Sequence, residues 1–242
     1  MKKNISQNYK LMCKEISEYI INYVTNKPES LLVFPGGDTP LGVFEELIRA
    51  VEEKHIDFSK CYFVSLDEWE NLDYTVKGSC IQTLYDSLYK KINIDIEKQV
   101  CFFDGKNNLV KECERINKFI EKYGPIDIAV LGIGMNGHIG FNEPGVDENT
   151  YCHVVPLDET TTNVSVKYFG KQMNIAHGIT LGMKHFYEAK KVLLMANGKH
   201  KSQIIKTVMT GSITKNVPAS LMRKGDNAEI YLDKDAASLL DN

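Results

Sequence analysis

The chain has 242 residues, 43% of them hydrophobic, which is long enough to bury a core and short enough to form one domain over 1–242. A formal net charge of -3 and the lack of any long run of Lys or Arg argue against nucleic acid as a partner. Charged residues interrupt the apolar part of the N-terminal segment, so we expect neither a signal peptide nor a membrane span there.

Segments of helical periodicity alternate with short apolar runs along the chain. Helices are expected at 5–26, 40–54, 79–91, 107–122 and 199–210. Strands are expected at 31–34, 62–66, 100–103, 126–133, 178–181, 191–196 and 229–233. No element is assigned to the irregular segment 144–177, which we interpret as a lid or a local excursion. The alternation predicts an α/β fold: a single-domain, Rossmann-like, mainly parallel sheet with helices on both faces.

The cysteines are scattered along the chain without any C-x-x-C pair. Zinc sites and disulfide frameworks need closer, patterned spacing. We therefore expect core thiols in a protein of the reducing cytoplasm, and no metal site. They are Cys13, Cys61, Cys80, Cys101, Cys113 and Cys152.

A glycine turn, FPGGDTPLG, follows the first expected strand, and ligands of open parallel sheets collect at such strand ends. Gly36 and Gly37 permit positive φ and close backbone approach, Thr39 can cap the next helix, and Pro40 suits its first turn. The helix N-terminus then favours an anion such as phosphate. An ordinary strand-to-helix turn is the alternative. Asp38 would repel a phosphate unless it points away or meets a sugar hydroxyl.

The stretch SLDEWENL follows the second expected strand and holds the only tryptophan. Neighbouring side chains on a strand face opposite ways, so Asp67 is expected to enter a site while Glu68 meets solvent or a structural partner. A carboxylate beside Trp69 in a partly dry pocket would have a raised pKa and serve as a general base. A solvated turn is the alternative.

The loop LGIGMNGHIGFNEPG contains Gly132-x-Gly134-x-x-Gly137, the spacing of a dinucleotide-binding fingerprint. That fingerprint needs a helix at its third glycine, whereas two more glycines and Pro144 follow here. Asp158 could match the acidic residue expected further on, but acidic residues are too common for this to count. The nicotinamide or flavin interpretation is therefore disfavoured.

The same loop fits acid–base chemistry better. His138 can take and give a proton near neutrality, and Glu143 is close enough in sequence to orient its imidazole. Asn136 offers a third, neutral partner. A histidine tied into a polar turn is the alternative, but the surrounding glycines make room for something close to the backbone.

The stretch NGKHKS places two lysines at the start of the last expected helix, just after the sixth expected strand. Lys199 or Lys201 could reach an anion at the same site. Lysines in the first turn of a helix are more often solvated.

Together these stretches resemble the glucosamine-6-phosphate deaminase/isomerase family. The histidine loop is similar to the family signature G-x-G-x-[DN]-G-H-[IL]-[AG]-[FL]-N-E-P, PGGDTPLG to its phosphate loop, and LDEW to its catalytic aspartate segment. GITLG, NGKHK and VPAS are similar to later family segments, so the resemblance covers most of the chain. It implies the family's fold, no metal or redox cofactor, and a small amino-sugar phosphate as partner, with homo-oligomerisation left open.

The resemblance also implies residue roles. Asp67 would shuttle a proton between C2 and C1 of the open-chain amino sugar, and His138 would act in ring opening, assisted by Glu143 and Asn136. The implied reaction is aldose–ketose isomerisation of a 2-amino-2-deoxyhexose 6-phosphate, then loss of ammonia with water, formally a hydrolysis. The expected substrate-binding residues are Gly36, Gly37, Asp38, Thr39 and Lys201, which matches the family's phosphate lysine.

Two positions depart from the family pattern. Asp38 stands where the family usually has a small residue, and Thr162 falls roughly where many members place a phosphate-binding arginine. Asn136 is a variant within the pattern. LDEWENL followed by KGSC, with LDETTT and AHGITLG later, looks closer to the galactosamine-6-phosphate branch.

Two other functions compete with the deaminase. A 6-phosphogluconolactonase shares the fold, but its loop runs G-P-D-G-H-T-A-S-L-F and its acidic segment reads D-E-R, unlike this chain. A non-catalytic sugar-phosphate sensor would explain Asp38 and Thr162. It would have no need for the positioned groups Asp67, His138 and Glu143.

Overall fold

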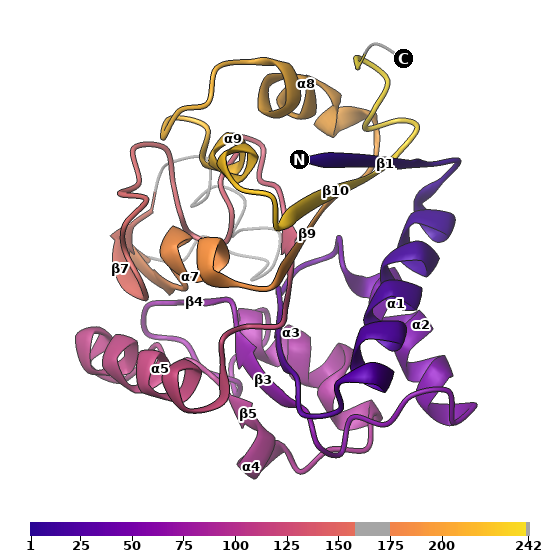
Figure 1. Cartoon of the computed structure of the whole chain (residues 1–242). Coiled ribbons are helices and arrows are strands. Elements are labelled where there is room, and N and C mark those ends of the chain that lie inside the picture. Colours follow the sequence, from indigo (N-terminus) through magenta and orange to yellow (C-terminus); the bar gives the residue numbers. More distant parts are fainter. Residues whose placement is uncertain (158–174, 241–242) are drawn as a thin grey trace.

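The structure, a computed structural model, describes residues 1–157 and 175–240. A seven-stranded parallel sheet runs between two groups of helices (Figure 1). Its strands are β1 (Lys2–Ser6), β2 (Leu31–Phe34), β3 (Tyr62–Ser65), β5 (Val100–Cys101), β6 (Ile128–Gly132), β9 (Lys191–Ala196) and β10 (Ala228–Asp233). Their order in the sheet is β1-β10-β9-β6-β2-β3-β5, and every neighbouring pair is parallel.

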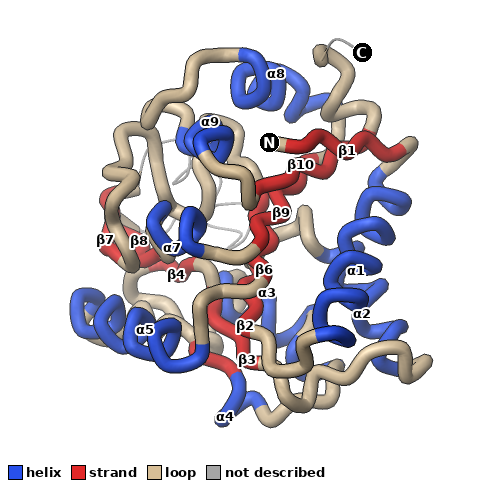
Figure 2. Tube along the Cα trace, in the orientation of Figure 1, coloured by secondary structure: helices blue, strands red, loops and turns tan. Residues whose placement is uncertain are grey.

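A smaller antiparallel sheet lies beside the central one (Figure 2). It consists of β4 (Asp67–Trp69), β8 (His177–Thr180) and β7 (His153–Pro156), with β8 in the middle. Asp67 is paired with Thr180 across β4 and β8. The strand expected at 178–181 therefore forms, but in this second sheet rather than the parallel one.

Helices cover both faces of the central sheet (Figure 1). One face packs mainly on α1 (Tyr9–Asn26), α2 (Leu41–Glu52) and α3 (Cys80–Ser87); the other packs on α5 (Leu109–Tyr123), α7 (Met183–Glu188), α8 (Ser202–Thr210) and α9 (Pro218–Leu221). A short helix, α4 (Ile96–Gln99), precedes β5. Alternate residues of β2 point to opposite faces of the sheet, as the two-residue period of a strand requires. Leu31 and Val33 pack in the core beside α5, and Leu32 and Phe34 pack in the core beside α1. The predicted fold class is confirmed.

The helix expected from residue 5 begins later than predicted. Lys2–Ser6 is an edge strand paired with β10, and α1 starts at Tyr9 after Asn8, whose side chain accepts a hydrogen bond from the Leu11 N–H. The register is supplied by β10, which lies at the other end of the sequence. Local periodicity carries no trace of such a partner.

The predicted cap of α2 by Thr39 is wrong. The helix begins at Leu41 after Pro40, without a side-chain cap from either neighbour. The Tyr9 hydroxyl takes that place, because it donates to the Thr39 carbonyl at 2.9 Å and accepts from the Gly42 N–H at 2.9 Å. The capping group thus comes from α1.

The irregular segment 144–177 holds β7, to which no element had been assigned. The rest of the expected lid, 158–174, lies outside the described residues. No helix in the described part of the chain is long and apolar enough to cross a membrane.

A buried carboxylate joins α1 to the amino ends of β2 and β6. Asp127 has no exposed surface, and it accepts hydrogen bonds from Lys27 Nζ at 2.6 Å, the Tyr23 hydroxyl at 2.9 Å and the Leu31 N–H at 2.9 Å. Its removal leaves three donors without their acceptor, and the loss is most costly for the Leu31 N–H, which is buried.

We expect Asp127→Ala to lower the free energy of unfolding by ~2–3 kcal/mol. For a chain of this size that corresponds to a fall in Tm of about 5–10 °C. Thermal denaturation followed by circular dichroism measures it. The control is Glu18→Ala, which removes an exposed ion pair with Lys14 on α1 and should leave Tm nearly unchanged. Equal Tm values for the two variants would contradict the structural role of Asp127.

Candidate active site

A cavity lies at the carboxyl ends of the central strands, where the strand order reverses. From β2 the chain continues outward to β3 and β5 on one side, while β6, β9 and β10 fill the other side. Loops after β2 and β6 diverge at this switch point and leave a cavity of about 210 Å³. Open parallel sheets bind ligands at this position.

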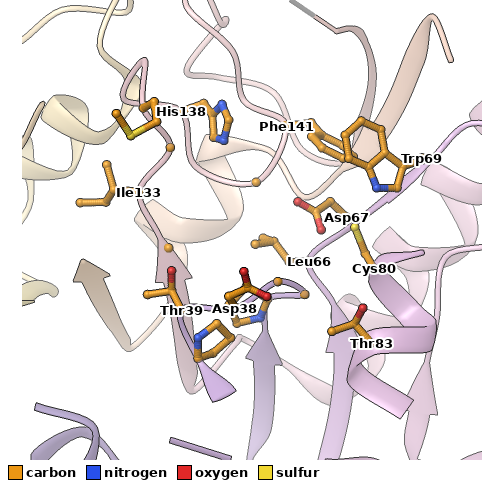
Figure 3. Close-up of a pocket in the computed structure, with 18 of the residues that line it drawn as sticks. Asp38, Thr39, Leu66, Asp67, Trp69, Cys80, Thr83, Ile133, His138 and Phe141 are labelled. Atoms are coloured by element: carbon orange, nitrogen blue, oxygen red, sulfur yellow. The ribbon is translucent and has the colours of Figure 1, made fainter. Parts of the chain in front are cut away.

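Seven of the nine predicted site residues line this one cavity. They come from four separate stretches of sequence and meet as Figure 3 shows for the labelled ones. The seven are Gly36, Gly37, Asp38, Thr39, Asp67, His138 and Lys201. Asn136 and Glu143 stand behind His138 and contact its loop instead. Lys199, the alternative to Lys201, does not line the cavity.

Asp67 is the buried acid of the site. Only 8% of it is exposed, and burial raises its pKa to about 6, although a hydrogen bond from the Cys80 thiol and the nearby His138 act in the opposite direction. Trp69 and Phe141 pack against each other beside it, with ring centroids 4.7 Å apart (Figure 3). The raised pKa expected for a carboxylate in a partly dry pocket is confirmed.

Glu68 faces the opposite way from Asp67 and meets a structural partner, as predicted. It accepts hydrogen bonds from the backbone N–H groups of Trp69 at 2.8 Å, Cys80 at 3.2 Å and Ile81 at 3.0 Å. The last two belong to the first turn of α3, whose N–H groups have no partner within the helix. Glu68 thereby fastens α3 to β4.

The histidine loop closes on itself around the His138 ring. The Gly134 N–H donates to the His138 carbonyl at 3.0 Å, and the Gly137 N–H donates to the Gly134 carbonyl at 3.0 Å. A Cβ on Gly134 would lie 2.2 Å from His138 Nε2. The glycines of this loop were expected to leave room for a group close to the backbone. At Gly134 the group that fills this space is the His138 imidazole.

Glu143 and Asn136 brace this histidine from behind. Glu143 is buried, and its Oε2 lies 3.4 Å from His138 Nδ1. Asn136 Nδ2 donates to the same Glu143 oxygen at 2.8 Å, while its Oδ1 accepts from the His138 N–H at 3.1 Å. The histidine thus has a carboxylate on one nitrogen and the cavity in front of it.

The other end of the cavity is the glycine turn after β2. Gly37 has φ +97°, as a tight turn needs, and a Cβ on Gly36 would lie 3.0 Å from the Cys80 Cα. Lys201 Nζ donates to the Ile133 carbonyl at 2.6 Å, which joins the lysine loop to the histidine loop. Asp38 lines the cavity too, so a bound anion would share this end with a carboxylate. Thr162 lies outside the described residues.

Two cavity residues of α3, Cys80 and Thr83, were missed. They reach the site because Glu68 holds the start of α3 against β4. The run Gly78-Ser79-Cys80 was the available signal, since small residues with a serine cap permit close packing at a helix start. Its contact with the turn after β2 is not visible in sequence spacing.

The loop after β6 also tests the dinucleotide interpretation. From Ile133 to Cys152, all within the described residues, the backbone forms turns and bends but no helix. The fingerprint's helix is missing, as predicted. Among the residues that the structure describes, no cluster of three or more His, Cys, Asp or Glu side chains is placed to hold a metal ion.

Acid–base side chains, a glycine-rich turn and a lysine of an α/β fold line one small cavity, an arrangement suited to proton transfer on a small anionic molecule. Comparison with known proteins narrows this. The chain belongs to the family described as glucosamine-6-phosphate isomerases/6-phosphogluconolactonase, whose model matches residues 4–231.

Similar relatives support the deaminase side of that family. The glucosamine-6-phosphate deaminase of Clostridium novyi (strain NT) is 38% identical over 97% of this chain and 98% of its own length. That of Thermoanaerobacter sp. (strain X514) is 36% identical over 99% of this chain and 95% of its own. A solved structure of a monomeric glucosamine-6-phosphate deaminase superposes with a TM-score of 0.94 at 29% identity, covering 99% of this chain and 100% of that one.

A solved 6-phosphogluconolactonase from Thermotoga maritima has a TM-score of 0.76 at 20% identity, over 96% of this chain and 99% of that one. At this identity the likeness shows the shared fold and carries no functional argument.

We expect Gly134→Ala to displace the His138 ring, because the added methyl group would occupy the space of Nε2. The φ of Gly134 is not in the left-handed region, so the backbone itself tolerates alanine. Crystal structures of the variant and of Gly132→Ala make the test, since a Cβ on Gly132 meets nothing within 4 Å. A ring within about 0.5 Å of its original place in Gly134→Ala would refute the packing argument.

Proposed function

We propose that the protein converts a 2-amino-2-deoxyhexose 6-phosphate and water into a ketohexose 6-phosphate and ammonia. The observation that carries this proposal is the buried carboxylate of Asp67, which faces the same cavity as His138 and the turn after β2. A carboxylate whose pKa is about 6 accepts and returns a proton near neutrality. Isomerisation of an amino sugar needs such a group. The names of the relatives agree with it.

Asp67 is the base in this proposal. It takes the proton from C2 of the open-chain sugar, and the C2–H electron pair forms a C1–C2 double bond as the C1 oxygen gains a proton. Asp67 then returns its proton to C1, and the nitrogen lone pair forms a C2 iminium. Water adds to C2, the C2–N bond breaks, and ammonia leaves with the ketose as the product. Overall, water is consumed and ammonia released, and C1 is reduced as C2 is oxidised, so no external oxidant or reductant is needed.

His138 opens the ring in this proposal. It transfers a proton from the anomeric hydroxyl to the ring oxygen, which requires a group that both accepts and donates near neutral pH. The Glu143 carboxylate at 3.4 Å from Nδ1 orients the imidazole and stabilises its protonated form. Asn136 holds that carboxylate in place.

The turn after β2 and Lys201 bind the phosphate in this proposal. Backbone N–H groups near Gly36, Gly37 and Thr39 precede α2, whose N-terminus favours an anion. Asp38 then meets a sugar hydroxyl instead of the phosphate. We place the reaction in cytoplasmic amino-sugar breakdown, with the free thiols of the chain in support. One solved relative is described as monomeric, which favours a monomer over a homo-oligomer.

Ammonia release, measured side by side on glucosamine 6-phosphate and galactosamine 6-phosphate, tests the proposal and decides the configuration at C4. We expect Asp67→Asn to lower kcat by ~10²–10⁴-fold on the better substrate, because the general base is lost, while substrate binding stays largely intact. Asp95→Asn, an exposed carboxylate beside Lys98, is the control and should keep full activity.

Other results would point elsewhere. Near-normal turnover by Asp67→Asn would exclude the assigned base. Binding of both sugar phosphates without ammonia from either would favour the sensor. Hydrolysis of 6-phosphogluconolactone in place of deamination would identify a lactonase.

The pH dependence of kcat/KM should rise through a midpoint near pH 6. Asp67 acts in its ionised form, and burial raises its pKa to about 6, so activity is lost as the pH falls through that value. An ordinary aspartate, with a pKa of about 3.9, would keep activity well below pH 5. A profile that stays flat down to pH 5 would contradict the role of burial at Asp67.

A further inference from the structure

We propose that Cys80 is a positioning residue for the reaction: its thiol holds the Asp67 carboxylate so that one oxygen faces the substrate. This inference rests on the proposed role of Asp67 as the proton shuttle. Cys80 does not touch the reacting atoms in this proposal. It acts through the carboxylate beside it.

The contact comes from the first residue of α3. The Cys80 side chain lines the cavity, and Figure 3 shows its sulfur beside the Asp67 carboxylate. Hydrogen bonding from this thiol lowers the pKa of Asp67, against the larger effect of burial. On its other side the thiol meets the Trp69 side chain through a second hydrogen bond. Figure 3 shows Cys80 beside both residues, at the wall of the cavity. The thiol therefore links the aromatic wall to the base.

Cys80 is fixed from three directions. Its N–H donates to Glu68 Oε1 at 3.2 Å, which ties it to the residue next to Asp67. The Ser79 side chain caps α3 by accepting from the Gln82 N–H at 3.0 Å. The Gly36 backbone packs so closely that a Cβ there would lie 3.0 Å from the Cys80 Cα. The thiol thus has a defined position relative to both Asp67 and the turn after β2.

Proton transfer between C2 and C1 requires a fixed orientation of the Asp67 carboxylate. One carboxylate oxygen must reach C2 and then C1 on the same face of the sugar, so free rotation of the carboxyl group would lose productive geometry. A donor on the second oxygen stops that rotation. A thiol is a weak donor, so it orients the carboxylate and removes less of its basicity than a strong donor would.

The groups that face Asp67 from the surrounding elements are few. Cys80 faces it from α3, His138 from the loop after β6, and Glu68 is its neighbour on β4. Thr180, the residue of β8 that pairs with Asp67, is uncharged. Burial raises the pKa of Glu68 to about 8, so Glu68 titrates above the acidic limb near pH 6. Carbon-13 titration of the Asp67 carboxyl group therefore assigns the limb to that residue.

Cys80→Ala and Cys80→Ser, compared in kcat and in the acidic limb of kcat/KM, test the proposal. We expect Cys80→Ala to lower kcat by about 3- to 10-fold, as loss of one hydrogen bond does. Loss of the donor also moves the midpoint of the limb up by about half a pH unit. In Cys80→Ser the hydroxyl supplies a donor again, so kcat recovers and the midpoint returns to the wild-type value or falls below it.

Cys61→Ala is the matched control. It removes another buried thiol just before β3, at the amino end of the strand, and should move neither kcat nor the midpoint. A fall in kcat for Cys80→Ala with an unmoved midpoint would mean packing alone and would overturn the proposal. So would wild-type kinetics in Cys80→Ala, or a Cys80→Ser variant as impaired as Cys80→Ala. Circular dichroism establishes that each variant is folded.

A separate measurement keeps this inference distinct from the proposed function. Carbon-13 NMR titration of the Asp67 carboxyl group, in the wild type and in Cys80→Ala, reads the hydrogen bond without any turnover. A higher midpoint in the variant supports the contact even if no sugar phosphate is deaminated, and an equal midpoint refutes it. Ammonia release that depends on Asp67 with an equal midpoint would leave the proposed function standing and remove the role of Cys80.

Discussion

The carboxyl group of Glu68 has no exposed surface, and its oxygens accept hydrogen bonds from the backbone N–H groups of Trp69, Cys80 and Ile81. Burying these oxygens without such donors would cost several kcal/mol, so the hydrogen bonds fix how β4 meets the start of α3. Because neighbouring side chains on a strand alternate, an inward Glu68 turns Asp67 into the cavity. The direction of the base is thus set by a residue that never meets substrate.

The two sheets divide the work of building the site. The parallel sheet supplies the turn after β2 and the histidine loop, and the small sheet supplies Asp67. Thr180 joins them: it pairs with Asp67 across β4 and β8, and its Oγ1 accepts the Phe141 N–H at 3.2 Å. The Leu181 N–H donates to the Leu66 carbonyl at 2.9 Å just beyond. Base and histidine are therefore held in one frame, although separate sheets carry them.

Sequence reasoning succeeded where the physical cause is local. Alternation of apolar runs and helical segments predicts the parallel sheet, and the failure of a helix to follow Gly137 can be read from Pro144 and the extra glycines. The raised pKa of Asp67 follows from an acid beside a lone tryptophan. The resemblance supplied the roles of these residues. Local residue types alone do not separate a proton shuttle from a structural acid.

Sequence reasoning failed where a residue far away in the chain determines the local structure. Lys2–Ser6 forms a strand only because β10 lies beside it, and Tyr9 replaces Thr39 as the cap of α2 only because α1 packs there. Cys80 enters the site through Glu68, which no spacing rule connects to it. Each is a contact between segments whose distance in sequence carries no signal. A fold is needed to see them.

The anchor at Asp127 and the cavity lie at opposite ends of the same strands. Asp127 precedes β6 and binds Lys27 and Leu31 at the amino edge, whereas the turn after β2 and the histidine loop leave from the carboxyl edge. The strands between them, β2 and β6, are buried except for Gly132 at the end of β6. Substitutions at the amino edge can therefore raise thermal stability, and substitutions at the carboxyl edge can change which sugar is accepted. Neither kind of change needs to affect the other property.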